Sequence, residues 1–314
     1  MHADGVRALP RLWDAAAIDR AVTWRRAVDA LRRALADGLD PDAEPLRVNT
    51  PFGAGHLLSM PSTGGRYAGV KLATVAPGNS TLGHPRVHAV YVVFDATTLA
   101  PFAVLDGTAL TTWRTPSVAA LGVDLVAPAD ASHLVLFGSG PQAWGHAQAL
   151  RDVRPVRTVA VVGRDATRAA ALVDRLRADG FDASTATASA VGDADLVACC
   201  TSSTTPVFDG RDLAAGAVVV ASGAHEPAHR EVDTETVRRC GGVVVEAVAA
   251  ARAEAGEVIA AEADAPTTLV TLADLVRGTA AAVPRLVDTV GMGWEDLAVA
   301  TAVLDHTDHG GDQP

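Results

Sequence analysis

The sequence predicts an α/β protein with two parts, a doubly wound parallel-sheet domain and an α+β domain built on an antiparallel sheet. From residue 131 to about 250, uniformly apolar strands such as AVVVA and VVV alternate with helical segments, as a parallel sheet covered on both faces requires. From 47 to 107, short strand-like runs separated by turn residues are typical of an antiparallel sheet. The length of 314 residues is enough for about two domains.

The helical segments have their own patterns. Residues 14–37 are predicted to form one amphipathic helix, because Val28, Leu31 and Leu35 recur at helical spacing. A further helical stretch, TTWRTPSVAALGVDLV, follows the antiparallel strands and leads into the alternating region. The last helical segment, VGMGWEDLAVATAVLDHT, has no strand partner there, so we expect it to return to the first domain.

These elements divide the chain into two predicted domains. The first combines residues 1–115 with 291–314, and the second covers residues 116–290. We find no internal repeat and no low-complexity linker between them.

The composition excludes several classes of protein. The formal net charge is −11, and the only basic cluster is formed by Arg25, Arg26, Arg32 and Arg33. This disfavours a nucleic-acid partner and an anionic membrane surface, since both require a cationic footprint. With no apolar run long enough to cross a bilayer, the chain is expected to be soluble.

The cysteines point to a reducing compartment, and the histidines do not form the pattern of a metal site. The three cysteines cannot form a disulfide framework, and a cytoplasmic location is expected. His225 and His229 have helical spacing, but Pro227 between them weakens the helix that would bring them together. We therefore predict no bound metal.

A dinucleotide-binding motif opens the second domain. The run LVLFGSGPQA is a buried strand that leads into Gly-x-Gly-x-x-Ala at the start of a helix, as in a Rossmann-type domain. Gly138 permits the tight turn, Gly140 lets a pyrophosphate approach the backbone, and Ala143 allows close packing of helix on strand. The predicted cofactor-binding residues of this motif are Gly138, Ser139, Gly140, Pro141 and Gln142.

The end of the next strand favours NADP(H) over NAD(H). An acidic residue that binds the ribose 2′-hydroxyl is expected there, but Gly163 occupies the position and Arg164 follows it. A guanidinium group would bind a 2′-phosphate. The alternative is that Arg164 is a surface residue and Asp165 binds the ribose, which would restore NAD(H).

By its motifs, the chain resembles the ornithine cyclodeaminase and mu-crystallin family over most of its length. The matching segments are GVKLATVAPGN, VVFDATTLAPFAVLDGTALTTWRTPSVAALG, LVLFGSGPQAWGHAQAL, the CCTSSTTPVF run, SGAHEPAHREVD and VDTVGMGWEDLAVA. The resemblance implies an N-terminal substrate-binding and dimerisation domain closed by the final helix, a central Rossmann domain that binds NAD(P), and a homodimer.

The resemblance also implies a set of site residues. Arg47, Lys71 and Arg114 match the positions that bind the substrate carboxylate and polarise its α-carbon, with Lys71 and Arg114 assigned to catalysis. Fixed cations in a dry cleft suit a small anionic substrate. Val290 and Gly291 are implied to lie against the substrate. Asn79, Thr201 and Ser202 are implied to lie near the nicotinamide or ribose, although each is equally compatible with a turn or cap.

The sequence departs from the family pattern in one turn. His225 stands where cyclodeaminases have an aspartate that handles protons on the substrate amine, and Glu226 follows it. A histidine can transfer protons near neutral pH, but it supplies no fixed negative charge beside a cationic amine. His225 is therefore predicted to be catalytic, and the departure argues against ornithine cyclodeamination.

The sequence thus predicts an NAD(P)H-dependent oxidoreductase that acts on a small amino or imino acid bearing a carboxylate. The leading hypothesis is reduction of an imine next to the carboxylate, of the pyrroline-2-carboxylate, piperideine-2-carboxylate or ketimine type, or the reverse oxidation of a small amino acid. The first alternative is ornithine cyclodeaminase, which converts ornithine to proline and ammonia without net redox change. The second is a catalytically silent nucleotide-binding protein of the crystallin type.

Overall fold

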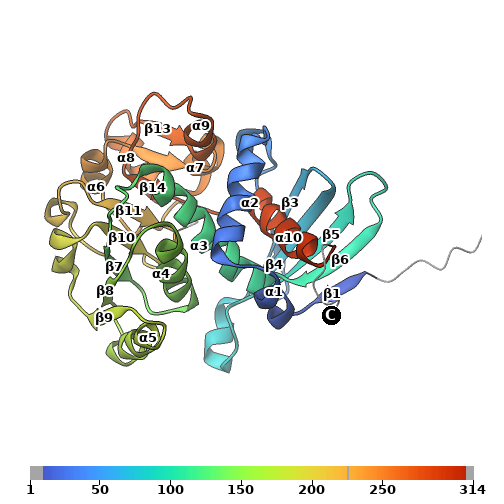
Figure 1. Cartoon of the computed structure of the whole chain (residues 1–314), viewed down its shortest axis with the longest axis horizontal. Coiled ribbons are helices and arrows are strands. Elements are labelled where there is room, and N and C mark those ends of the chain that lie inside the picture. The colour runs from blue at the N-terminus through green and yellow to red at the C-terminus, as the bar shows by residue number, and fades with distance from the viewer. Residues whose placement is uncertain (1–9, 225, 309–314) are drawn as a thin grey trace, which may run out of the picture. The chain divides into compact units, whose positions relative to one another are not determined.

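A computed structural model describes residues 10–224 and 226–308 of the chain. These residues form two compact units, each of which is described by itself (Figure 1). Unit 1 draws on Met1–Thr23, Glu44–Thr111 and Met292–Pro314, and unit 2 on Trp24–Ala43 and Thr112–Gly291.

Unit 1 is built on a six-stranded sheet in the order β1-β6-β5-β4-β3-β2. Strands β2 to β6 pair antiparallel with their neighbours, which confirms the antiparallel sheet predicted from the sequence. Strand β1 joins the edge by parallel pairing with β6. The strands are β1 (Arg11–Trp13), β2 (Val48–Phe52), β3 (Gly55–Gly64), β4 (Tyr67–Val75), β5 (Val87–Asp95) and β6 (Pro101–Asp106).

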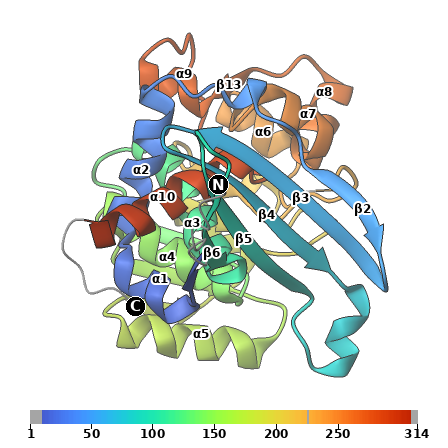
Figure 2. The same cartoon turned by 90° about the vertical axis from the view of Figure 1, so that its right-hand side faces the viewer.

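Helices cover one face of this sheet. Helix α10 (Gly293–Asp308) packs against β3 and β4, and α1 (Ala15–Ala21) packs against α10 and β6. Strand residues alternate between the two faces, and the helices bury the side chains that point toward them. In the described part of unit 1, no helix covers the opposite face of β3, β4 and β5, which faces the viewer in Figure 2. A short 3-10 helix, η2 (Pro77–Leu82), connects β4 to β5.

Unit 2 contains an eight-stranded sheet in the order β13-β12-β14-β11-β10-β7-β8-β9. Every pairing in it is parallel, which confirms the doubly wound domain predicted from the alternating pattern. The strands are β7 (His133–Phe137), β8 (Thr158–Val162), β9 (Asp182–Thr185), β10 (Leu196–Cys199), β11 (Val218–Ala221), β12 (Val243–Val245), β13 (Leu269–Thr271) and β14 (Leu286–Asp288).

Helices alternate with these strands along the chain (Figure 1). Helix α3 (Gly107–Val126) begins in unit 1 and continues into unit 2. The others in unit 2 are α2 (Trp24–Ala36), α4 (Pro141–Val153), α5 (Ala166–Ala178), α6 (Thr234–Cys240), α7 (Val248–Glu254), α8 (Gly256–Asp264) and α9 (Leu272–Arg277). Short 3-10 helices are η1 (Pro41–Ala43), η3 (Ala188–Asp193) and η4 (Gly210–Asp212).

The single helix predicted over 14–37 is wrong, because the chain forms two helices there. Helix α1 ends at Ala21, and its C-cap residue Val22 is extended with φ −126° and ψ 147°. The β-branched pair Val22 and Thr23 disfavours helix at the junction. The two helices also serve different units, since α1 packs with α10 and β6, whereas α2 packs with α4 and α9.

This division moves residues 24–43 from the first predicted domain into unit 2. Hydrogen bonds fix the segment there, because Arg277 donates to the carbonyl oxygens of Leu35 and Leu39. The Trp24 ring also lies against Trp113 of α3, with ring centroids 4.1 Å apart. An amphipathic pattern reports that one face of a helix is buried, but it does not report which unit buries that face.

Among residues 10–224 and 226–308, no helix is both long enough and apolar enough to cross a membrane.

Candidate active site

The turn between β7 and α4 has the geometry that a dinucleotide requires. Gly138 has φ +115°, and a Cβ atom there would lie 2.6 Å from the carbonyl oxygen of Cys200, so only glycine fits. Gly140 caps α4 without a side-chain hydrogen bond, and a Cβ atom there would meet nothing within 4 Å. The helix N terminus is therefore accessible to a pyrophosphate. The remaining predicted residues of the turn are Ser139, Pro141 and Gln142.

The end of β8 carries an exposed cation beside a carboxylate that caps the next helix. Strand β8 ends at Val162, so Gly163 follows it directly. Asp165 caps α5, because its side chain accepts hydrogen bonds from the amides of Thr167 and Arg168 at 3.0 and 3.1 Å. Arg164 lies between the two and is exposed. The aspartate that was the alternative ribose partner is thus engaged in capping the helix.

Glu231 joins the loops that follow β10 and β11. One carboxylate oxygen accepts the amide and the hydroxyl of Thr201, both at 2.6 Å. The other accepts the amides of Ser222 and Gly223, at 3.2 and 2.7 Å. Burial raises the pKa of Glu231, and these hydrogen bonds partly offset that rise. Thr201 is therefore held by Glu231, whereas Ser202, also predicted to bind the cofactor, is exposed.

Two more buried carboxyl groups adjoin Glu231. The amide of Glu231 donates to Glu257 at 2.6 Å, and burial raises the pKa of Glu257 to about 7. Burial, together with the charges of Glu257 and Glu231, raises the pKa of Asp288 well above its ordinary value. Like charges in a desolvated site oppose one another's ionisation, so burial and mutual repulsion act in the same direction on the pKa of these carboxyl groups.

A buried histidine connects the cofactor helix to the sheet. His146 of α4 lies 2.8 Å from the carbonyl oxygen of Gln142 through Nδ1 and 3.2 Å from the hydroxyl of Ser222 through Nε2. The Thr289 hydroxyl donates in turn to Ser222 at 3.0 Å. Since the Gln142 carbonyl only accepts, Nδ1 carries the proton and Nε2 accepts from Ser222. Desolvation lowers the pKa of His146 to about 4, so the ring is neutral at physiological pH.

This histidine makes the fold sensitive to acid. In the unfolded chain His146 titrates near its ordinary pKa of 6.5, so between pH 6.5 and 4 the unfolded state binds a proton that the folded state excludes. We expect the stability advantage of the wild type over His146→Gln to shrink by about 3 kcal/mol as the pH falls from 7 to 4. Urea unfolding of both proteins at several pH values measures this, and a constant difference would contradict it.

Arg114 lies against the loop that follows β14. It is on α3 with 8% of its surface exposed, and a Cβ atom on Gly291 would lie 2.2 Å from Nη1 and 2.7 Å from Nη2. Gly291 has φ +83°, which also favours glycine. Glu246 fastens this loop, since its two carboxylate oxygens accept the amides of Val290 and Gly291, each at 2.9 Å. Three predicted residues, Arg114, Val290 and Gly291, are thus brought together.

Lys71 is buried in unit 1 beside a carboxylate. It lies on β4 with 3% of its side chain exposed, and Asp296 of α10 is fully buried. The Lys71 Nζ is 3.0 and 2.7 Å from the two carboxylate oxygens of Asp296. The neighbouring strands place Met60 and Tyr91 opposite Lys71 in register. The lysine therefore occupies a dry, charge-compensated site.

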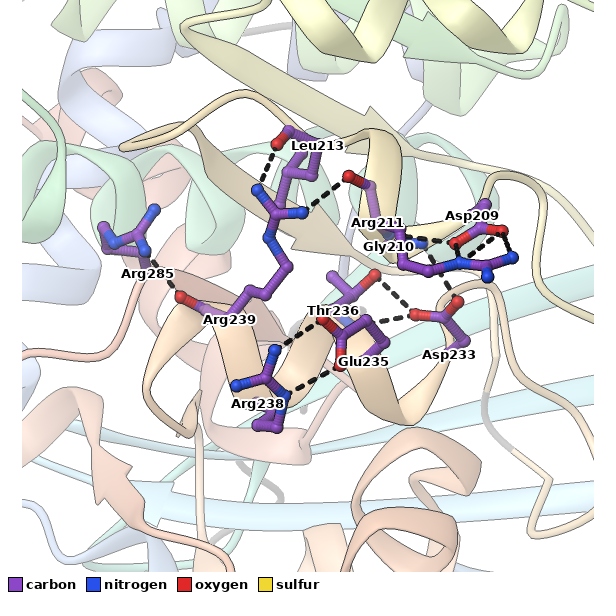
Figure 3. Close-up of polar contacts among 10 residues, drawn as sticks. All are labelled: Asp209, Gly210, Arg211, Leu213, Asp233, Glu235, Thr236, Arg238, Arg239 and Arg285. Atoms are coloured by element: carbon purple, nitrogen blue, oxygen red, sulfur yellow. Dashed lines mark hydrogen bonds and ion pairs between the residues drawn. The ribbon is translucent and has the colours of Figure 1, made fainter.

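The surface cations of unit 2 offer a contrast, because they are arginines (Figure 3). Arg211 pairs with Asp209 at 2.5 Å and Arg238 with Glu235 at 2.6 Å. Both arginine side chains are more than 70% exposed, at 77% and 72%. Solvated pairs of this kind contribute little to stability, because water screens their charges. Lys71 is the one lysine in the sequence, and its surroundings are of a different kind.

The other predicted residues lie in less distinctive places. Arg47 is half-buried just ahead of β2. Asn79 lies in η2, and its side-chain amide donates to the carbonyl oxygen of Pro85 at 2.9 Å. His225 lies outside the described residues. Glu226 is 54% exposed and lies 3.7 Å from the His229 ring. Within 10–224 and 226–308, no group of three or more His, Cys, Asp or Glu side chains is arranged so that it could hold a metal ion.

Sequence reasoning missed the buried carboxyl groups described above, which are Glu231, Glu246, Glu257, Asp288 and Asp296. Glu231 and Asp296 stand inside segments that carried the family resemblance, HREVD and GWEDLAVA. Glu246 follows the apolar strand VVV, at the carboxyl edge where α/β sheets bind ligands. A charged residue beside an apolar run is the signal that Glu246 and Asp296 offered, whereas Glu231 stands in a polar run and offered none.

Known proteins similar to this chain cover most of its length. The Delta(1)-pyrroline-2-carboxylate reductase 2 of Burkholderia ambifaria is 37% identical over 268 residues, 84% of this chain and 85% of that protein. The Delta(1)-pyrroline-2-carboxylate/Delta(1)-piperideine-2-carboxylate reductase of Azospirillum brasilense is 35% identical over 299 residues, 94% of this chain and 95% of that protein.

Solved structures share the fold. A probable ornithine cyclodeaminase from Bordetella pertussis has a TM-score of 0.87 at 32% identity, covering 98% of this chain and 100% of that one. The Delta(1)-pyrroline-2-carboxylate reductase of Thermococcus litoralis, solved in complex with NADH and L-proline, has a TM-score of 0.88 at 24% identity, covering 97% and 99%. The family model for ornithine cyclodeaminase/mu-crystallin proteins matches residues 15–311, and the chain therefore belongs to the ornithine cyclodeaminase/mu-crystallin family.

Proposed function

We propose that the protein is an NAD(P)H-dependent reductase of a C=N bond adjacent to a carboxylate, with a cyclic imine of the pyrroline- or piperideine-2-carboxylate type as substrate. The observation that carries the proposal is Lys71, a buried lysine paired with Asp296 in a chain that otherwise uses arginine. The relatives that are 35–37% identical and named as reductases of these imines support it. A ketimine or the reverse oxidation of a small amino acid belongs to the same reaction class.

The cationic side chains have complementary roles in this proposal. Arg114 and Arg47 bind the substrate carboxylate through their planar guanidinium groups. Lys71 presents its ammonium group to the C=N bond and favours the build-up of electrons on nitrogen. The Gly138–Gln142 turn would hold NAD(P)H, which would supply hydride to the imine carbon, and a proton added to nitrogen would complete the amine. His225 and a water molecule are the candidate proton carriers for that last step.

The direct test is an assay with purified protein, NADPH and a panel of imines. We expect loss of NADPH absorbance in a one-to-one ratio with the amine formed. The absence of NADPH oxidation across the panel would contradict the proposal. Ammonia release from ornithine without net change in nicotinamide would instead support cyclodeamination, and nucleotide binding without any turnover would support a silent crystallin-type protein.

The proposed cofactor is NADP(H), with NAD(H) as the alternative. Arg164 at the end of β8 and the capping role of Asp165 support this choice. We expect Arg164→Ala to raise KM for NADPH about 10-fold while KM for NADH stays unchanged, since a charge-assisted contact to the 2′-phosphate is lost. Arg157→Ala is the matched control, because Arg157 precedes the first residue of β8 and is exposed, as Arg164 is. Equal effects on both cofactors would contradict the assignment.

The proposed assembly is a homodimer formed through the uncovered face of the unit 1 sheet. This face carries Val70 and Leu72 of β4 opposite Val92 and Val90 of β5. Apolar side chains on a sheet face without a helix need a covering surface, and a second copy supplies one with two-fold symmetry. An alanine dehydrogenase of the same fold was solved as a dimer. The cytoplasm remains the proposed location, in keeping with three free cysteines.

A charge on that face tests the dimer. Val90 is 37% exposed in the single chain, and we expect Val90→Asp to sediment as a monomer at concentrations where the wild type is dimeric. Val283→Asp, at a 58% exposed valine of unit 2, is the control and should remain dimeric. A wild type that sediments as a monomer, or a Val90→Asp protein that stays dimeric, would contradict the proposed interface.

A further inference from the structure

Asp296 stands out as a buried charged group that the proposed reaction does not itself use. It comes from α10, 225 positions along the chain from Lys71, yet its carboxylate meets the lysine at 3.0 and 2.7 Å. Both side chains are buried, with 3% and 0% exposed. A buried ion pair contributes little net stability compared with apolar residues of similar size, so its presence in a core calls for another reason.

The start of α10 is fixed tightly enough to set the position of this carboxylate. Gly293 lies so close to β3 that a Cβ atom there would be 2.6 Å from the carbonyl oxygen of Pro61. The amide of Met292 donates to Glu295 at 2.9 Å, which secures the turn ahead of the helix. Trp294 is 1% exposed. The first turn of α10 is therefore pressed against the sheet, and Asp296 follows within it.

Two further titratable side chains, Tyr91 and Glu44, lie near the pair. Tyr91 lies opposite Lys71 on β5, and Gly69 makes room for its hydroxyl, since a Cβ atom there would lie 2.1 Å from that oxygen. Burial, with the charges of Asp296 and Glu44, raises the pKa of Tyr91 well above its ordinary value, so the phenol stays neutral. Burial also raises the pKa of Glu44, which the Ser62 hydroxyl partly offsets.

We propose that Asp296 is a positioning residue for Lys71, which holds the ammonium group charged and at a fixed place in the buried site. The inference rests on the proposed function, because it gives Lys71 the role of a fixed cation toward the substrate. A lysine in a dry site without a carboxylate partner tends to lose its proton, and a neutral amine would not stabilise charge on the imine nitrogen. A carboxylate that contacts Nζ through both oxygens also restricts the rotamers of a long, flexible chain.

The presence of one lysine in the chain makes this proposal directly measurable. Protein labelled with 13C at lysine Cε gives a single side-chain signal, whose shift reports the charge on Nζ. We expect this signal in Asp296→Asn to titrate about one pH unit or more below that of the wild type. Asp305→Asn, a half-buried aspartate on the same helix, is the matched control and should titrate as the wild type does. Equal titration of Asp296→Asn and wild type, both folded, would overturn the proposal.

Kinetics provide the second readout. If imine reduction is observed, we expect Asp296→Asn to lower kcat about 10²-fold, with binding of NADPH unchanged. The alkaline limb of the kcat–pH profile should move to lower pH, because Lys71 would lose its proton more easily. Asp305→Asn should keep the wild-type values. A loss confined to KM for NADPH, or an unshifted pH profile, would overturn the assignment. The lysine signal requires no turnover, so failure of the proposed function is distinguishable from failure of this inference.

A double variant covers the case in which Asp296→Asn folds poorly. Removal of Asp296 alone takes a carboxylate away from a buried ammonium group, whereas Lys71→Met combined with Asp296→Asn removes both charges. We expect the double variant to unfold at a higher urea concentration than Asp296→Asn alone. Additive losses from the two substitutions would mean that the carboxylate does not act through Lys71, and would overturn the proposal.

Discussion

Lys71→Arg is expected to lower kcat for imine reduction about 10²- to 10³-fold while the fold and NADPH binding are retained. The substitution keeps the positive charge, so the Asp296 carboxylate still has a partner. It replaces a compact ammonium with a larger planar group in a site where 3% of the side chain is exposed. Overpacking of this kind costs about 1–3 kcal/mol of stability, which a folded chain tolerates.

Steady-state kinetics and fluorescence titration with NADPH measure the two parts of this prediction. Arg86→Lys, at an exposed position of unit 1, is the reciprocal control and should leave both unchanged. Full activity in Lys71→Arg would mean that charge alone is needed at this position. The single lysine would then be an accident of composition.

Gly291→Ala is expected to raise KM for the carboxylate substrate about 10²-fold. A Cβ atom at this position would lie 2.2 Å from Nη1 of Arg114, so the guanidinium group has to move from its place. Loss of a bidentate carboxylate contact is worth about 1.5–3 kcal/mol, which accounts for most of that factor. The effect should fall on KM for the carboxylate substrate, because the group that the new Cβ atom displaces is the Arg114 guanidinium.

Gly278→Ala separates this effect from backbone strain. Gly278 also has a positive φ, at +69° compared with +83° for Gly291, but a Cβ atom there would meet nothing within 4 Å. Both substitutions should lower the free energy of unfolding by about 1–2 kcal/mol, because an L-residue is strained in this region. Only Gly291→Ala should change KM. Equal kinetics in the two variants would exclude the placement of Arg114 as a determinant of substrate binding.

The sequence was sufficient for those features that depend on local pattern. Apolar strands alternating with helices predict a parallel sheet because buried strands need no polar face, and the sheet of unit 2 is parallel throughout. The Gly-x-Gly-x-x-Ala run predicts a tight turn at a helix N terminus, and Gly138 has the positive φ that such a turn requires. The contact between Arg114 and Gly291 could not be predicted from local pattern, since the two residues are 177 positions apart in the sequence.

Features that depend on partners from distant segments could not be predicted in the same way. The amphipathic pattern over 14–37 identified apolar faces correctly but not the break at Val22, because the two halves pack in different units. The family resemblance implies Lys71 as a site residue, but its carboxylate partner Asp296 could not be predicted, since an ion pair leaves no periodic signal. Glu231 and Glu246 were missed for the same reason, because backbone amides of other loops are their partners.

Hydride transfer to the imine is the central claim, and labelled cofactor tests it most directly. The protein is incubated with pyrroline-2-carboxylate and NADPH that carries deuterium at C4 on the transferable face, and the product is analysed by mass spectrometry and NMR. The account predicts proline with one deuterium at Cα and one NADP⁺ formed for each proline. Proline that carries no deuterium would contradict the account. So would the absence of proline in every reaction, whichever C4 face is labelled and whether the cofactor is NADPH or NADH.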